Sequence, residues 1–170
     1  MNRNGLIKVI TFVLLLFSYS IVIVGQTQVN YARDTKRIWL DSDIAHNGGY
    51  KWKMMMARDV ADSGEKISLF DYTTTNWLPA IVPGTVLNSL VYNKKYPEPY
   101  YGLNNKIESQ LIPDIAEAGR DFYTYWFRTE FTVPESFNGR HVWLQIDGIN
   151  YRAEVWVNGN LLSTIKGMFL

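Results

Sequence analysis

The feature that most constrains this chain is a series of short alternating segments in its second half. In residues 125–133, 142–146 and 151–157, apolar side chains occupy every second position, which in a strand places them on one face. Asn138-Gly139 and Asp147-Gly148 lie between these segments, and Asn158-Gly159 follows the last one. Such pairs readily adopt the positive φ angles of tight hairpin turns. The pattern predicts antiparallel strands that cover a core.

Other segments extend this prediction to an all-β sandwich. Further strands are expected over 37–40, 50–55, 66–70, 80–82 and 161–165. One short helix is expected after Thr85, a suitable N-cap, because Val86, Leu87, Leu90 and Val91 fall on one side. Residues 96–122 contain three prolines and two glycines without sustained periodicity, so we expect a long loop there, of the kind that often carries function.

The first 26 residues resemble an export signal. Arg3 and Lys8 precede an uncharged apolar run from Val9 to Val24, which is the layout of a secretory signal peptide. An uncleaved membrane anchor is the alternative, because the run approaches the length of a membrane span. We therefore divide the chain into a signal peptide or anchor, residues 1–26, and a folded domain, residues 27–170. We expect the domain to be exported, periplasmic or secreted, with a membrane as partner only if the leader is uncleaved.

Composition and charge exclude several classes of function. The 17 basic and 16 acidic residues are interspersed and form no basic stripe, so no nucleic-acid partner is predicted. The absence of cysteine excludes disulfides, thiolate zinc sites and a cysteine nucleophile. His46 and His141 are far apart in the sequence, and no metal or cofactor is predicted.

Three segments, in this order, carry a resemblance to a known family. They read WLPAIVPGTVLNSLVYNKKYPEPYYGLN (77–104), YTYWFRTEFTVP (123–134) and WLQIDGINYRAEVWVNG (143–159). Together they resemble the N-terminal domain of glycoside hydrolase family 2, in the branch that holds the β-mannosidases and exo-β-glucosaminidases. The resemblance implies a galactose-binding-like jelly-roll sandwich, followed in the family by an immunoglobulin-like sandwich and a barrel with the two catalytic carboxylates.

No segment of this sequence corresponds to that barrel. The parent protein is therefore expected to be a glycoside hydrolase, whereas this chain is expected to be inactive alone, with no catalytic residue assigned. The strand expected at 161–165 has no visible partner beyond it before Leu170, and we interpret the domain as incomplete at its C-terminus. Glu98 and Asp114 are the carboxylates that stand out, because both lie in the long loop beside prolines and aromatic residues.

The candidate ligand residues lie in the same loop. Sugars are bound by aromatic rings that stack on their apolar faces and by polar side chains that fix their hydroxyls. Glu98, Tyr100, Tyr101 and Asn104 offer both kinds of group in a stretch restrained by Pro97, Pro99 and Gly102. We expect them to border a pocket for a terminal β-linked sugar, a β-mannoside or β-glucosaminide. The alternative is that the two tyrosines only pack the loop onto the sandwich.

The second face of the predicted sheet is less easily interpreted. It combines Trp126, Trp143 and Trp156 with Arg128, Glu130, Arg152 and Glu154. Burial against the second sheet or the missing domains is the favoured interpretation, with cross-strand Arg–Glu pairs and a sugar platform as alternatives. Two other functions also fit the fold, a stand-alone carbohydrate-binding module and a structural sandwich domain without a ligand.

Overall fold

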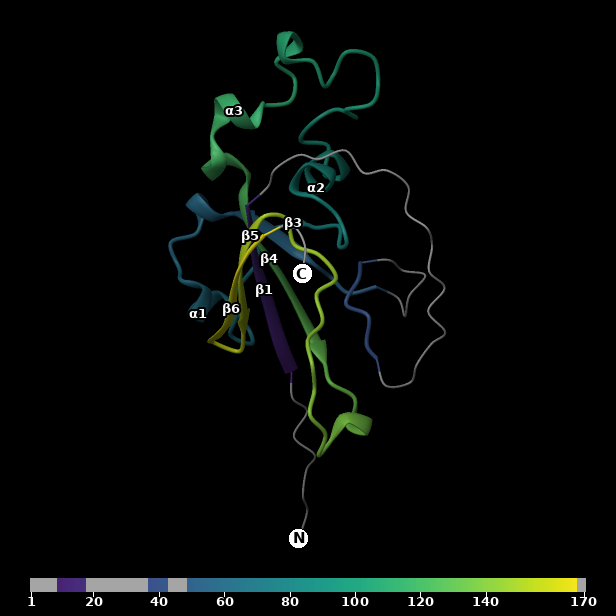
Figure 1. Ribbon diagram of the computed structural model, residues 1–170, viewed down its shortest axis with the longest axis vertical. Coiled ribbons are helices and arrows are strands. Elements are labelled where there is room, and N and C mark those ends of the chain that lie inside the picture. The colour runs from purple at the N-terminus through teal and green to yellow at the C-terminus, as the bar shows by residue number, and fades with distance from the viewer. Residues whose placement is uncertain (1–8, 18–36, 43–48, 168–170) are drawn as a thin grey trace.

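The computed structural model describes residues 9–17, 37–42 and 49–167, and these contain one six-stranded sheet (Figure 1). The strands are β1 (Val9–Phe17), β2 (Lys53–Met56), β3 (Leu78–Pro79), β4 (Thr124–Thr132), β5 (Arg152–Val157) and β6 (Asn160–Lys166). Their order in the sheet is β3-β2-β4-β1-β5-β6, and neighbouring strands are antiparallel. His46 and the turn expected at Asn47-Gly48 lie outside the described residues.

Short helical segments connect the strands. The α-helices are α1 (Gly64–Ile67), α2 (Val86–Tyr92) and α3 (Ile115–Ala118), and the 3-10 turns are η1 (Ala57–Asp59), η2 (Ile107–Ser109), η3 (Arg120–Tyr123) and η4 (Glu135–Phe137). The expected helix after Thr85 is confirmed as α2, and the Thr85 side chain accepts a hydrogen bond from Asn88 N at 3.0 Å. The expectation of a single helix is wrong, because α1 and α3 each add one four-residue turn.

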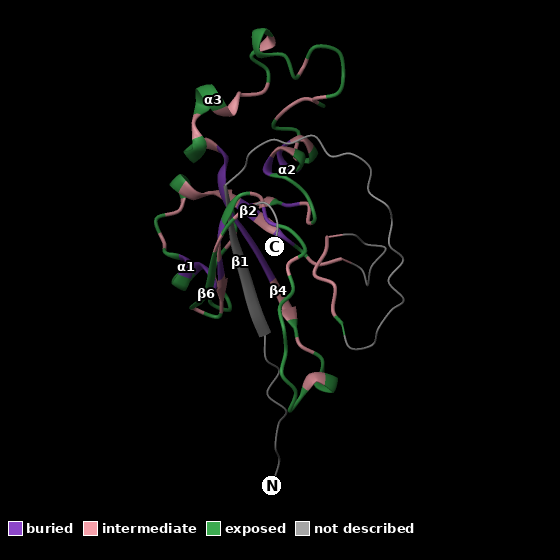
Figure 2. Cartoon of the chain, in the orientation of Figure 1, coloured by how far each residue is buried: buried purple, intermediate pink, exposed green. Residues whose placement is uncertain are grey.

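Strand β4 is coloured as buried along most of its length (Figure 2) and contributes side chains to a core on each of its faces. Tyr125 and Phe127 belong to the larger core, with Trp52, Met54, Val86 and Val155 among its buried members. Trp126 points to the opposite side and forms a smaller core with Ile67 and Trp77. This arrangement confirms the predicted division of the strand into two faces, and it explains why residues 124–129 are all buried.

Three of the predicted strands were confirmed almost residue for residue. The structure has β4, β5 and β6 within one residue of the predicted bounds. Between β5 and β6, Asn158 and Gly159 both have positive φ, 48° and 83°, as an Asn-Gly hairpin turn requires. Strand β2 covers the second half of the segment expected at 50–55.

Other strand predictions were wrong, for reasons visible in their contacts. Residues 66–70 form the end of α1 and a turn, in which Ser68 N donates to the Gly64 carbonyl at 3.0 Å, a helical bond and not a ladder bond. Residues 37–40 and 80–82 are joined to neighbouring segments by single bonds rather than a ladder, such as Ser42 N to the Val82 carbonyl at 2.6 Å. Strand β3 lies just before the expected 80–82 segment.

The segment 142–146 also forms no strand. Within the described part of the chain, the backbone of these residues donates to and accepts from no other backbone group. Val142, Trp143 and Leu144 are exposed. Its alternating pattern therefore lacks the partner strand that would make it part of a sheet.

Part of the expected leader is a strand of this sheet. β1 runs between β4 and β5, and pairs along its whole length with β4, from Val9 opposite Thr132 to Phe17 opposite Thr124. The rest of the first 26 residues lies outside the described residues, and the signal peptide stays a prediction. No helix within residues 9–17, 37–42 and 49–167 has the length and apolar character needed to cross a bilayer.

Candidate functional site

The long loop between α2 and β4 extends beyond the end of the sheet (Figure 1). It begins after Asn93, whose side chain donates to the carbonyls of Pro79 and Ser89, both at 2.7 Å. It contains only the short turns η2, α3 and η3. The prediction of a long loop over 96–122 is therefore confirmed, with a fixed point where it leaves α2.

Two tyrosines attach the loop to the larger core. Tyr96 packs against that core, and the Tyr123 hydroxyl donates a hydrogen bond to the carbonyl of Pro113. Burial, with smaller contributions from Tyr96, Tyr125 and Asp114, raises the pKa of Tyr123 to about 12. The hydroxyl thus keeps its proton, and the bond to Pro113, over the whole physiological pH range.

The segment 98–104 is braced by its own hydrogen bonds. The Glu98 carbonyl accepts from Tyr101 N at 3.2 Å and from Asn104 Nδ2 at 2.9 Å. Asn104 N in turn donates to the Tyr101 carbonyl at 3.2 Å. Gly102 has a φ of 57°, which favours glycine at this position. The Asn104 amide therefore serves as a brace that closes the loop.

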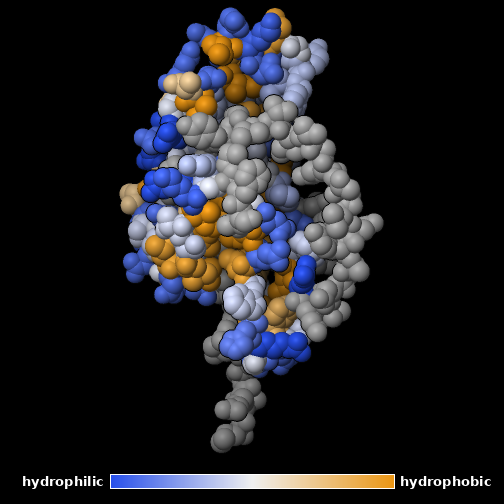
Figure 3. All heavy atoms as spheres, viewed as in Figure 1, coloured by the Kyte–Doolittle hydropathy of each residue, from blue (hydrophilic) through white to orange (hydrophobic). Residues whose placement is uncertain are grey.

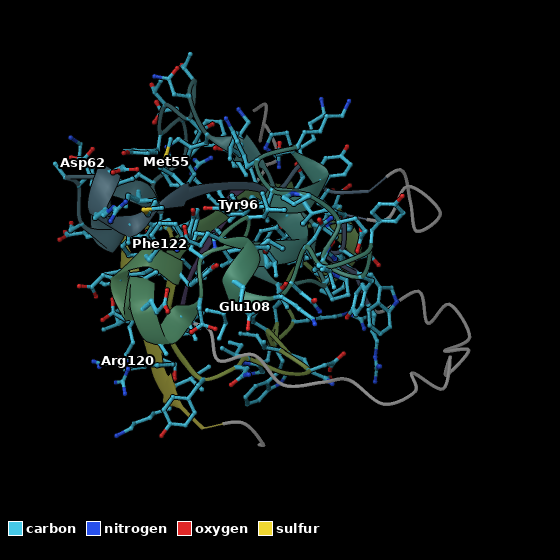
Figure 4. All side chains as sticks on the ribbon, turned by 90° about the horizontal axis from the view of Figure 1, so that it is seen from above. Met55, Asp62, Tyr96, Glu108, Arg120 and Phe122 are labelled. Atoms are coloured by element: carbon cyan, nitrogen blue, oxygen red, sulfur yellow. The ribbon has the colours of Figure 1, made fainter. Side chains whose placement is uncertain are left out.

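The two tyrosines that the brace presents are open to solvent. Tyr100 is 91% exposed and Tyr101 is 77% exposed, and Leu103 beside them is also exposed. The alternative in which they pack the loop onto the sheet is therefore not what the structure has. Seen from above (Figure 4), Tyr96 and Phe122 lie nearer the middle of the molecule than Arg120 does. The loop thus has an anchored base and an aromatic, exposed end.

The carboxylates singled out in the sequence have ordinary structural partners. Asp114 Oδ1 accepts from Ala116 N at 2.7 Å and caps α3. Glu98 is exposed, with its Oε1 3.5 Å from Tyr100 N. Near the strands, Glu130 pairs with Arg128, and Glu154 accepts from Trp156 Nε1 at 3.1 Å. In the part of the chain that the structure describes, no three His, Asp or Glu side chains are grouped as a metal ion would require.

The tryptophans of the second face differ in their surroundings. Trp126 is buried in the smaller core, and Trp156 packs against that core half-buried. These two are buried or half-buried, as expected, but their cover is the segment around α1 and Trp77 of this chain, not the second sheet or missing domains that the favoured interpretation named. Trp143 is 89% exposed and stands apart from them. These positions do not form a shared sugar platform.

The importance of Arg128 was missed at the level of sequence. Its guanidinium is buried in the middle of β4, where Nε donates to the Ile67 carbonyl at 3.0 Å and Nη2 to the Leu69 carbonyl at 2.9 Å. Tyr72 lies beneath it, with the guanidinium carbon 5.9 Å from the ring centre. A charged residue inside an otherwise aromatic run was the available signal, because such a residue is rarely buried without partners.

A shallow apolar hollow lies on the side of the sheet that carries the larger core. It has a volume of about 230 Å³ and is lined by Leu144, Ile146, Val155, Leu162, Ser163 and Ile165. In Figure 3, apolar surface gathers near the middle of the visible face, over β6. The loop offers polar side chains beside its aromatic rings, whereas the lining of the hollow is apolar apart from Ser163. The hollow is therefore a weaker candidate for a sugar site.

The fold and the loop define a class of protein, a mostly-β domain that presents exposed aromatic side chains on a braced loop. The chain belongs to the glycosyl hydrolase 2 galactose-binding domain-like family, whose model matches residues 52–170. This match includes the loop and every strand except β1. The resemblance found in the sequence is thereby confirmed.

Curated relatives point to the same branch. A mannosylglycoprotein endo-β-mannosidase of Lilium longiflorum is 47% identical over 97 residues, 57% of this chain. An exo-β-D-glucosaminidase of Streptomyces avermitilis is 31% identical over 61% of the chain, and β-mannosidase B of Aspergillus terreus 33% over 59%. Each match spans about a tenth of the relative's own length. No solved structure matches the chain at a significant level.

Proposed function

We propose that this chain is the N-terminal, non-catalytic domain of an exported family 2 exo-glycosidase that hydrolyses terminal β-linked mannosides or glucosaminides. It helps to shape the substrate pocket through the loop 97–104. The observation that carries the proposal is the exposed Tyr100–Tyr101 pair on a braced loop, in a chain whose relatives include mannosidases and glucosaminidases. The names of these relatives include both exo- and endo-acting enzymes, and the exo mode is part of the proposal.

Each loop residue has a distinct part in this proposal. Tyr100 and Tyr101 stack on the apolar face of a sugar ring, and the exposed Glu98 carboxylate accepts hydrogen bonds from sugar hydroxyls. Asn104 keeps its amide on the Glu98 carbonyl and so positions the other three. Because the loop is closed by its own bonds, it loses little conformational entropy on binding.

Bond cleavage is assigned to a domain outside this sequence. Retaining glycosidases need two carboxyl groups about 5 Å apart, one of them with a raised pKa. In the described residues, Asp114 caps a helix and Glu130 pairs with a buried arginine, so both carboxylates have structural tasks. The jelly-roll sandwich, with a second sheet and further strands beyond Leu170, belongs to this proposal as well.

Kinetics of the complete enzyme test the role of the loop. Glu98→Ala and Tyr101→Ala are expected to raise KM about 10-fold, because one stacked ring or charged hydrogen bond is worth about 1–1.5 kcal/mol. Tyr92→Ala is the matched control, since Tyr92 is 63% exposed on α2 rather than on the loop. An unchanged KM in both loop variants contradicts the assignment.

Calorimetry of the 170-residue chain distinguishes the alternative functions. The proposal predicts no glycosidase turnover and no strong binding of mannosides or glucosaminides by this chain alone, because the rest of the pocket is missing. A stand-alone carbohydrate-binding module would bind one of these sugars unaided. The DNA downstream of Leu170 gives an independent answer, because an in-frame barrel supports the hydrolase and an immediate stop codon opposes it.

Export has its own test. N-terminal sequencing of protein recovered outside the cytoplasm is expected to begin near Gly25 or Gln26. Recovery of intact chain in the membrane fraction supports the anchor instead.

A further inference from the structure

Strands β4 and β5 are not direct neighbours, because β1 lies between them (Figure 1). β1 pairs with β4 over nine residues and with β5 at Phe12, Val13, Leu14 and Phe17. Since it is antiparallel to both, β4 and β5 run parallel to each other. Two strand spacings of about 4.8 Å separate them, so the space between them accepts one strand.

The strand in this position differs in origin from its two neighbours. β4 and β5 lie within residues 52–170, the part of the chain that matches the family. β1 lies outside that part and within the apolar core of the expected leader. The family segment therefore provides β4 and β5, the two strands that border this position and are called its walls below. It does not provide the strand that lies between them.

The walls are poorly suited to remain unpaired. Residues 124–129 of β4 are all buried, and so are Ala153 and Val155 of β5. Without a strand between them, the inner N–H and C=O groups of β4 and β5 lack partners beside these buried side chains, which costs free energy. An exposed apolar edge of this kind also promotes aggregation.

We infer that the position between β4 and β5 is a strand-accepting site, filled in the mature protein by a strand from the polypeptide that follows this domain. Val9–Phe17 takes that position in the unprocessed chain. The inference rests on the proposed function, because it requires both removal of the leader and a longer parent protein.

The walls also define the chemistry of the incoming strand. Trp126 and Phe127 of β4 face two different cores, so a neighbouring strand needs apolar side chains on both faces. Strands buried on both faces have nearly continuous apolar sequences rather than alternating ones. The segment VITFVLLLF of β1 has this character. We expect a similar uncharged stretch of about nine residues, antiparallel to β4, in the downstream sequence.

A disulfide reports whether β1 occupies the site. The chain has no cysteine, so a designed pair has no competitor. Thr11→Cys with Glu130→Cys joins positions that face each other across β1 and β4 and is expected to crosslink in the folded chain. Thr11→Cys with Thr164→Cys is the control, because Thr164 lies on β6, two strands away, and is expected not to crosslink. Failure of the first pair to crosslink overturns the inference.

Hydrogen exchange then tests whether residues 9–17 or a downstream strand fills the site. The folded 170-residue chain, with a protease site engineered after Gln26, is cut and the leader removed. The amides of β4 and β5 are expected to exchange at least 10-fold faster, and a synthetic peptide of residues 9–17 flanked by lysines is expected to restore protection. The same peptide with Leu14→Pro is the control, because Leu14 pairs with both walls and proline has no N–H to donate.

In the complete parent protein, loss of residues 1–26 is expected to leave the exchange of β4 and β5 unchanged. Fast exchange in the parent overturns the inference, because β1 would then be an irreplaceable strand of the mature domain. Retained protection in the cut 170-residue chain overturns it as well, because the site would need no strand. Glycosidase activity of the parent is read separately, so a failure of the proposed function is distinguishable from a failure of the strand site.

Discussion

Replacing Arg128 by methionine removes the group that fastens the α1 segment to the sheet. The side chain is only 6% exposed, and it donates to the carbonyls of Ile67 and Leu69. Methionine keeps much of the volume but donates to neither carbonyl. The smaller core of Ile67, Trp77 and Trp126 lies directly under this attachment.

The magnitude follows from the bonds that are lost. A hydrogen bond from a charged group contributes about 1.5–3 kcal/mol, so two such bonds give an expected loss of about 3–6 kcal/mol in the free energy of unfolding. The ion pair with Glu130 adds at most about 1 kcal/mol, because the Glu130 side chain is 35% exposed. Losses of this size are a large part of the stability of a small domain.

Urea denaturation followed by tryptophan fluorescence measures this loss. Arg140→Met is the matched control, since Arg140 is exposed in the turn after η4, and we expect a change within about 0.5 kcal/mol. Arg128→Lys is expected to fall between the two, because one ammonium group lacks the fork that reaches two carbonyls. If Arg128→Met is no more destabilising than Arg140→Met, then the hydrogen bonds of Arg128 do not fasten the α1 segment to the sheet.

Three further predictions concern single contacts. Thr85→Ala is expected to cost about 1 kcal/mol by urea denaturation, because the α2 cap is lost, and Thr85→Ser to cost little; equal losses contradict the capping role. Gly64→Ala is expected to cost about 1–3 kcal/mol, because a Cβ would lie 2.5 Å from the Trp156 indole. Gly148→Ala, where the added atom meets nothing within 4 Å, is the control, and a similar effect at both glycines counts against the clash. Burial raises the pKa of Tyr125 from 10.0 to about 12, so its contribution is complete below pH 10 and is lost as pH rises toward 12, by about 1.4 kcal/mol per pH unit. Tyr125→Phe is expected to flatten this decline in thermal unfolding scans, and an unaltered slope argues against it.

Local patterns predicted the parts of the fold that local interactions determine. The Asn158-Gly159 turn and the Thr85 cap depend on neighbouring residues only, and both were confirmed together with the elements beside them. The segment 142–146 has an equally clear alternating pattern and forms no strand. A pattern gives a strand its faces, whereas its place in a sheet depends on a partner elsewhere in the chain.

The apolar run near the N-terminus shows that one local pattern can fit two different structures. An uncharged apolar run is typical both of an export signal and of a strand buried on both faces. The sequence of β1 satisfies both descriptions, and only its pairing with β4 and β5 shows that residues 9–17 form a strand.

The candidate site was predictable in position but not in detail. Proline, glycine and tyrosine content identified the loop, because these residues disfavour regular elements and offer stacking surfaces. Within the loop, Asn104 is a brace and the tyrosines are exposed. These separate roles depend on the turn geometry, which composition alone does not determine.

The most direct test of the account is a measurement of contact between the loop tyrosines and a sugar. Fluorotyrosine is placed at Tyr101 of the complete parent enzyme, and its fluorine resonance is followed while a slowly hydrolysed β-mannoside or β-glucosaminide is added. We predict a saturable shift at Tyr101 and none at Tyr92, which is exposed on α2. A resonance at Tyr101 that stays in place while the enzyme is saturated with sugar contradicts the proposed contact between the loop tyrosines and the substrate.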